Sequence, residues 1–234
     1  MTHSLHRCGS SESLSGDYVV LIMAAKGVNE GNSPEALQRF IRLASERQAV
    51  SIGDMRQGCS PDRTIKELID GLSPTSIVHA LFADREKLTV FLRDLAREDL
   101  GLSVTVSGLL GPLEQLTRDL GLSEAPHTVS YSLGVRGRLD LLPEQRVREI
   151  TSMCGHALVS PALVEQVADE LAIGAATPEQ CAQRLAAPCL CGIFNPCRAA
   201  RLLSEMVADR TSPTLMAHDE PDARLTRQSE SSGY

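Results

Sequence analysis

Short apolar runs alternate with longer segments of helical periodicity through the first part of the chain, and this alternation constrains the fold more than any other feature. Short runs rich in Val, Ile and Leu are typical of β-strands. They cover residues 18–24, 49–53, 76–82, 102–107 and 128–133. Strands that alternate with helices are normally joined by right-handed crossovers into a parallel sheet with helices on both faces. The pattern therefore predicts a doubly wound α/β fold with a mainly parallel, five-stranded sheet.

No further strand pattern follows residue 142. Four helical segments follow instead, each beginning with a proline, which is favoured in the first turn of a helix: residues 143–150, 161–173, 178–186 and 196–208. We therefore predict a sheet domain at residues 17–142 and a helical module at residues 143–208. The two ends, residues 1–16 and 209–234, are polar and lack an apolar period, so we expect them to be disordered tails.

The composition excludes several classes of function. Hydrophobic residues make up 42% of the chain and charged residues 23%, as in ordinary globular proteins. Aromatic residues make up only 3% and the net charge is −7, which argues against a nucleic-acid partner. The longest apolar run, residues 18–25, is too short to span a membrane, and residues 1–16 lack the apolar stretch of a secretory signal. We expect a cytoplasmic protein whose seven cysteines stay reduced.

Five soft donors gather in two short, turn-like stretches of the helical module. Cys154 and His156 form a C-x-H pattern, and Cys189, Cys191 and Cys197 form C-x-C-x5-C. Glycine and proline beside these donors favour turns, and the two intervening helices can fold back as an antiparallel pair that brings the turns together. Four cysteines, or three with His156, can bind zinc, and the same residues can bind an iron–sulfur cluster. The sequence therefore predicts a metal centre and leaves both cofactors open.

Two loops at the expected ligand-binding edge of the sheet carry further candidate site residues. Asp54, Arg56 and Cys59 lie just before a predicted helix, whose N-terminus favours a thiolate. Cys59 can act there as a nucleophile, as a redox thiol or as an additional metal ligand. Arg136 and Arg138, separated by one glycine, can grip a carboxylate or phosphate, or can simply be exposed charges. We predict Cys59 as the catalytic residue and the other four as substrate-binding residues.

These features support two main hypotheses. The first is an iron–sulfur or zinc-dependent enzyme that acts on a small anionic substrate at the seam between sheet and module. The alternative is a non-catalytic regulatory or accessory protein that senses or delivers a metal or cluster, and a third possibility is a thiol-redox protein. Cys59 and the arginines should face the thiolate cluster in an enzyme and lie apart from it otherwise. His79, within an apolar run, is expected to be a core histidine with satisfied hydrogen bonds. The sequence does not identify a protein partner.

Overall fold

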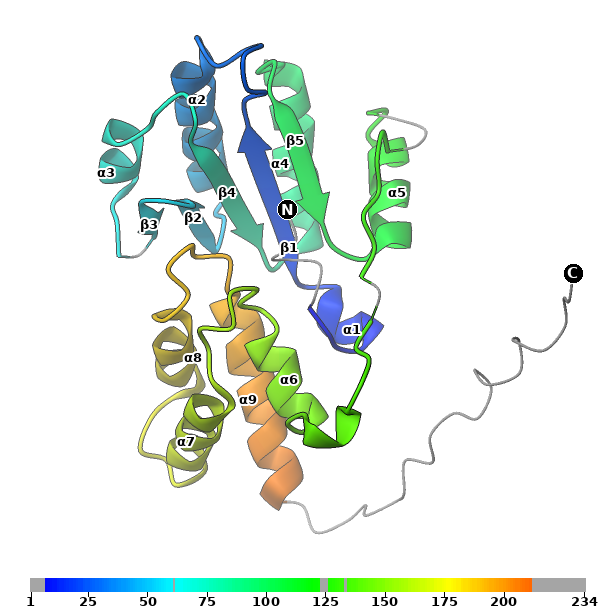
Figure 1. The fold of residues 1–234 in the computed structure, drawn as a ribbon, viewed down its shortest axis with the longest axis vertical. Coiled ribbons are helices and arrows are strands. Elements are labelled where there is room, and N and C mark those ends of the chain that lie inside the picture. The colour runs from blue at the N-terminus through cyan, green and yellow to red at the C-terminus, as the bar shows by residue number, and fades with distance from the viewer. Residues whose placement is uncertain (1–6, 61, 123–125, 133, 212–234) are drawn as a thin grey trace, which may run out of the picture.

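The computed structural model describes residues 7–60, 62–122, 126–132 and 134–211 (Figure 1). The strands are β1 (Tyr18–Met23), β2 (Ser51–Asp54), β3 (Gly58–Cys59), β4 (Ile77–Phe82) and β5 (Ser103–Ser107). The helices of the first part are α1 (Ser11–Leu14), α2 (Ser33–Glu46), α3 (Ile65–Asp70), α4 (Arg85–Glu98) and α5 (Leu110–Asp119). A short 3-10 helix, η1 (Leu139–Leu141), precedes α6 (Gln145–Thr151), α7 (Pro161–Ala172), α8 (Pro178–Ala186) and α9 (Pro196–Thr211). None of the described helices is long and apolar enough to cross a membrane.

The sheet is antiparallel, so the predicted doubly wound, mainly parallel sheet is wrong. The strand order is β3-β2-β4-β1-β5, and each neighbouring pair runs in opposite directions. β1 and β2 share a direction, as the helix between them suggested, but β4 is inserted between the two. β1 is likewise inserted between β4 and β5. This is the ferredoxin-like, split β-α-β arrangement, a term that describes strand order and not iron content.

Local sequence patterns could not reveal this insertion. A strand–helix–strand unit has the same apolar periodicity whether its two strands are neighbours or are separated by a third strand, because only distant pairing differs. The structure also differs from the prediction in two strands, one that was predicted and is not found and one that was not predicted. Residues 126–132 contain no strand, and residue 133 lies outside the described residues. The two-residue strand β3, which pairs with β2 through Gly53 opposite Cys59, is too short to leave a period in the sequence.

One face of the sheet is covered by α2 and α4, which lie behind it in Figure 1. Alternate residues of β1, namely Tyr18, Val20 and Ile22, point into this layer because side chains of a strand alternate between faces. Phe40 of α2 and Phe91 of α4 meet edge to face within it, with ring centroids 5.3 Å apart. Each buried side chain of this size contributes about 1.5–3 kcal/mol to the stability of the fold.

The opposite face receives the C-terminal helical module. Val19, Leu21 and Leu81 point toward it and join one continuous core with α6 to α9. Phe194, in the loop that precedes α9, is fully buried in this core. The segment that carries the predicted metal ligands is therefore packed directly onto the sheet.

A buried network of charges ties the N-terminal segment to the module. Arg198 of α9 is only 2% exposed, and its Nη1 donates to Asp17 Oδ2 at 3.0 Å. Its Nη2 lies 3.8 Å from Glu149 of α6. Arg7 forms an ion pair with the other carboxylate oxygen of Asp17, Oδ1. The predicted N-terminal tail, residues 1–16, is thus ordered from Arg7 onward, and its last part includes α1.

We predict that Asp17→Asn lowers the free energy of unfolding by about 3 kcal/mol, because it leaves Arg7 and Arg198 buried without a carboxylate. Urea denaturation followed by circular dichroism measures the change. Asp140→Asn is the matched control, since it removes an exposed pair with Arg138 and should change stability little. Equal effects of the two substitutions would contradict the structural importance of the buried network.

Candidate metal centre

The two turns that carry the predicted ligands follow α6 and α8, and both helices pack against α7 and α9. The first turn begins where α6 ends, with the amide of Cys154 donating to Thr151 O at 3.2 Å. The second follows α8, where the amide of Cys189 donates to Ala186 O and that of Gly192 donates to Cys189 O, both at 2.8 Å. Gly192 has φ +76°, a left-handed conformation that glycine adopts without strain. These tight turns direct the thiols toward one another.

Three cysteines and one histidine form a chain of contacts. Cys189 Sγ lies 3.8 Å from Cys191 Sγ, and Cys191 Sγ lies 3.7 Å from Nδ1 of His156. A hydrogen bond joins the thiols of Cys154 and Cys189. The three sulfurs are buried, whereas His156 is exposed. In the described part of the chain, no three side chains of Cys, His, Asp or Glu surround one point closely enough to hold an ion as they stand, so the contacts are pairwise.

The spacing of these contacts is close to that of ligands on one tetrahedral ion. With Zn–S of about 2.3 Å and Zn–N of about 2.0–2.1 Å, tetrahedral geometry puts two sulfurs about 3.8 Å apart and a sulfur and a nitrogen about 3.6 Å apart. The observed separations are 3.8 Å between Cys189 and Cys191 and 3.7 Å between Cys191 and His156. Two of the separations among the four donors are therefore those expected for ligands of one tetrahedral ion.

Hydrogen bonds at the sulfurs give the three thiols different pKa values. The hydrogen bond with Cys189, together with the backbone amide of Ile193, lowers the pKa of Cys191 to about 7. For Cys189, the hydrogen bond with Cys154 lowers the pKa, but the hydrogen bond with Cys191 and burial outweigh it and raise the pKa to about 11. The hydrogen bond with Cys189 and burial raise the pKa of Cys154. Cys191 is thus the thiol that most readily becomes a thiolate ligand.

The remaining cysteines of the module lie elsewhere. Cys197, predicted as a ligand, is exposed in the first turn of α9, where the charge of Lys87 of α4 lies near its thiol. Cys181 is buried between helices, where its thiol donates to Val167 O at 3.4 Å. The structure therefore brings together Cys154, His156, Cys189 and Cys191 and leaves Cys197 apart.

Cys59 lies beneath the second ligand turn, in a row of residues across three strands. Gly53 of β2 is paired with Cys59 of β3 on one side and with His79 of β4 on the other. A Cβ on Gly53 would come within 2.7 Å of Cys59 Cβ and 2.6 Å of His79 Cε1, so both side chains lean over the glycine. Gly192 fills the space above them, because a Cβ there would lie 2.3 Å from Cys59 Sγ and 3.3 Å from His79 Nε2. This packing leaves no room for a substrate between the thiol and the imidazole.

His79 differs from the satisfied core histidine that we expected. It is fully buried, and neither ring nitrogen has a hydrogen-bond partner of good geometry, although the backbone of Gly192 lies close enough to raise its pKa against the effect of burial. Burial lowers the pKa of His79 to about 4, so the ring is neutral at physiological pH. Burial also raises the pKa of Cys59, against the effect of a hydrogen bond with Ser51. Both members of the pair are therefore held in their uncharged forms.

The predicted substrate-binding residues have partners of their own or are exposed, and Asp54 lies in the same β-hairpin as Cys59. Asp54 closes the turn between β2 and β3, where its Oδ1 accepts the amides of Arg56 at 2.8 Å and Gln57 at 3.2 Å. Arg56 Nη1 donates to Thr75 Oγ1 at 3.1 Å. Arg138 is exposed and donates to Asp140 from Nε at 2.9 Å and from Nη2 at 2.6 Å. Arg136 is also exposed.

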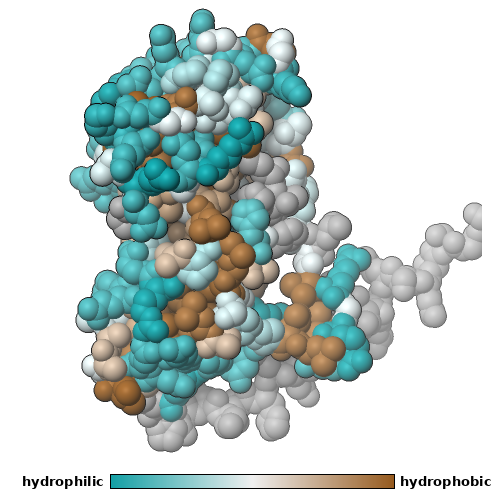
Figure 2. Space-filling view, turned by 60° about the vertical axis from the view of Figure 1, so that its left-hand side comes forward, coloured by the Kyte–Doolittle hydropathy of each residue, from teal (hydrophilic) through white to brown (hydrophobic). Residues whose placement is uncertain are grey.

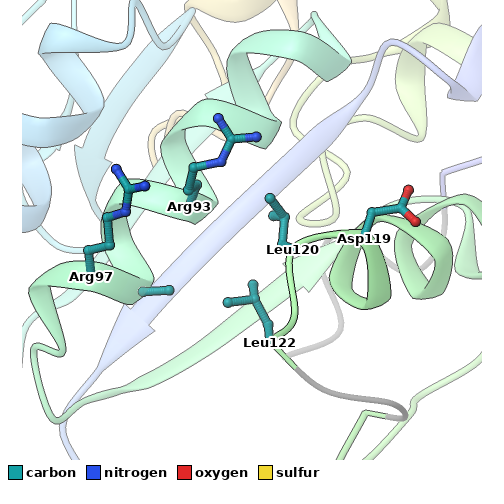
Figure 3. Close-up of a pocket in the computed structure, with 6 residues that line it drawn as sticks. Arg93, Arg97, Asp119, Leu120 and Leu122 are labelled. Atoms are coloured by element: carbon teal, nitrogen blue, oxygen red, sulfur yellow. The ribbon is translucent and has the colours of Figure 1, made fainter.

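The surface holds two further features of note. A shallow groove of about 350 Å³ lies between α4 and α5, lined by Arg93, Ala96, Arg97, Asp119, Leu120 and Leu122. Figure 3 shows the side chains of Arg93 and Arg97 extending to the same side of α4. No cysteine or histidine lines this groove, so it is separate from the metal centre. Figure 2 shows apolar side chains across the middle of one face, and Leu190, between the two cysteines of the second turn, is 74% exposed.

Comparisons with known protein families, with curated protein sequences and with solved structures each found no match. The geometry is therefore the basis for assigning the site. Two groups that matter to it were missed from the sequence, the row formed by Cys59 with His79 and the network around Arg198. The only local signal for the first was a histidine inside an apolar strand, and for the second an arginine directly after Cys197.

We predict that Gly192→Ala destabilises the protein by more than the strain of its left-handed backbone, which costs about 1–2 kcal/mol. The added Cβ would collide with Cys59, a further cost of about 1–3 kcal/mol. Gly174→Ala is the matched control, since Gly174 has φ +70° and open space around its Cα. Urea denaturation compares the two, and equal losses of stability would contradict the close seating of Gly192.

We predict that the metal-free protein loses stability as the pH falls from about 6.5 to 4. Because the pKa of His79 is lower in the folded chain, the unfolded chain takes up this proton first, so the contribution is present above 6.5 and is lost below it. The loss amounts to about 3 kcal/mol. The measurement is urea denaturation at several pH values, and the His79→Gln variant should show a shallower dependence. An unchanged slope in the variant would assign the effect to other groups.

Proposed function

We propose that this protein binds one zinc ion through Cys154, His156, Cys189 and Cys191, and that the ion has a structural, non-catalytic role in a regulatory or accessory protein. The observation that carries this proposal is the spacing of the contacts around Cys191, 3.8 Å to Cys189 and 3.7 Å to His156. Three thiolates and one imidazole are a common ligand set of structural zinc. The backbone amides at the sulfurs favour the thiolate forms that the ion requires.

The spacing favours a single ion over the iron–sulfur cluster that the sequence also allowed. In a four-iron cluster each cysteine binds a different iron, so its ligating sulfurs lie farther apart than two ligands of one ion. Cys189 and Cys191 are separated by one residue and their sulfurs are in contact. Cys197, which would complete a set of four thiolates, lies apart from the other donors.

A closed site also supports the non-catalytic alternative. Four protein ligands fill a tetrahedral ion, whereas catalytic zinc keeps one position for water or substrate. An enzyme for a small anion would need Arg136 and Arg138 near the ion, but Arg138 is engaged with Asp140 at the surface. Gly192 further occupies the space beside Cys59. We propose a cytoplasmic location on the ground that these thiols must stay reduced to bind the ion.

The ion would stabilise the attachment of the module to the sheet. Cys154 ends the turn after α6, whereas Cys189 and Cys191 lie in the turn that packs onto the sheet. An ion bound by both turns joins them without a covalent bond and adds its binding free energy to folding. This role resembles that of zinc in other small modules, in which the metal replaces part of a hydrophobic core.

We predict that protein purified without oxygen contains one zinc per chain and no sulfide. Cys191→Ser should weaken zinc binding by more than the roughly 10–100-fold typical of residues that only support ligands. Cys197→Ser, which removes a thiol outside the cluster, is the matched control and should bind zinc as the parent does. Elemental analysis and titration against a chelator measure both.

Three other outcomes would each contradict part of the proposed function. Iron with stoichiometric sulfide would replace the single ion with a cluster. The absence of both metals, together with no zinc uptake on titration, would remove the proposed function. Equal losses in Cys191→Ser and Cys197→Ser would contradict the assigned ligand set.

A further inference from the structure

The N-terminal segment contacts both turns that carry the proposed ligands. The amide of Cys8 donates to Ser152 Oγ at 3.1 Å, two residues before Cys154. The guanidinium of Arg7 donates to the carbonyl of Ile193, two residues after Cys191. We refer to residues 7–17 as the strap, because they cross from one ligand turn to the other.

One peptide group links Arg7 to a ligand sulfur. The carbonyl of Ile193, which accepts from Arg7, belongs to the same peptide unit as the amide of Phe194. That amide forms a hydrogen bond with Cys189 on the other side of the peptide. A donor on the carbonyl polarises the peptide and strengthens the amide as a donor on its other side. Arg7 therefore orients the peptide that is hydrogen-bonded to Cys189.

The strap is held in place by buried groups rather than by loose surface contacts. The side chain of Arg7 is only 5% exposed and pairs with Asp17. Arg198 donates to Cys8 O at 2.7 Å and to Ser13 Oγ at 3.0 Å. Gly9 has φ +148° and lies so close that a Cβ there would be 2.6 Å from Arg198 Nη2. The strap thus docks in one defined position.

From these contacts we infer that the strap is a positioning element of the metal centre, and that its docking and ion binding strengthen each other. This inference rests on the proposed function. Docking of the strap holds both turns in the position in which their donors face one another, which favours ion binding. The bound ion in turn fixes both turns that the strap contacts. Thermodynamic linkage requires the two effects to be equal in size.

The first test compares ion binding in three proteins. Arg7→Gln should bind Co²⁺ about 10–100-fold more weakly than the parent, as expected for loss of a group that supports a ligand. Its sulfur-to-cobalt charge-transfer band should also shift, because the hydrogen bond to Cys189 weakens. Arg7→Lys keeps a cationic donor and should restore much of the affinity. Arg138→Gln, at an exposed ion pair, is the control and should behave as the parent.

The second test needs no variant. Trypsin can cleave after Arg7 only when the strap leaves its site. The parent protein should therefore be cleaved more slowly with zinc bound than after zinc removal. The ratio of the two cleavage rates should be similar to the loss of affinity in Arg7→Gln. Mass spectrometry of the released peptide follows the cut. If the parent binds no ion, the proposed function fails. If the parent binds the ion but Arg7→Gln binds it equally well, the coupling is wrong and the proposed function stands. The same conclusion follows if zinc does not change the rate of cleavage after Arg7.

Discussion

The seating of residues 191–194 against the sheet governs how the rest of the site is arranged. Gly192 packs against Cys59 and His79, and its carbonyl accepts a hydrogen bond from Ser51 Oγ at 3.0 Å. The next carbonyl, of Ile193, accepts from the strap, while the sulfur of Cys191 faces the turn after α6. These partners come from parts of the chain that are distant in sequence. The turn can reach this position only when sheet, strap and helical module are all folded, so ligand geometry and tertiary structure form together.

The thiols are arranged as acids of unequal strength rather than as equivalent groups. Hydrogen bonds place the most acidic thiol at Cys191, whereas Cys154 and Cys189 keep their protons more tightly. An ion that binds here must displace those protons, which links its affinity to pH. Backbone amides offset part of this cost because they stabilise each thiolate. Below the turn, His79 is fully buried and Cys59 is half-buried.

The sequence was a good guide to local structure and a poor one to long-range pairing. The strands at Tyr18–Met23 and Ile77–Phe82 lie within the predicted apolar runs, because a buried strand needs only local hydrophobicity and β-propensity. Their antiparallel contact was not predictable, since it depends on which strand enters between which neighbours. The environment of His79 was hidden for the same reason: Cys59 and Gly192 reach it through pairing and packing, not through neighbouring positions in the chain.

The sequence by itself determined where the longer helices and the strands β1, β2, β4 and β5 form and which short turns hold thiols and imidazole, because glycine, proline and apolar period act over a few residues. The tertiary structure alone decided that the sheet is antiparallel, that Cys197 stands apart from the other cysteines, and that residues 7–17 bind both ligand turns. These outcomes depend on contacts between segments that are far apart along the chain. Such contacts are selected by the packing of the whole molecule, and no local pattern encodes them.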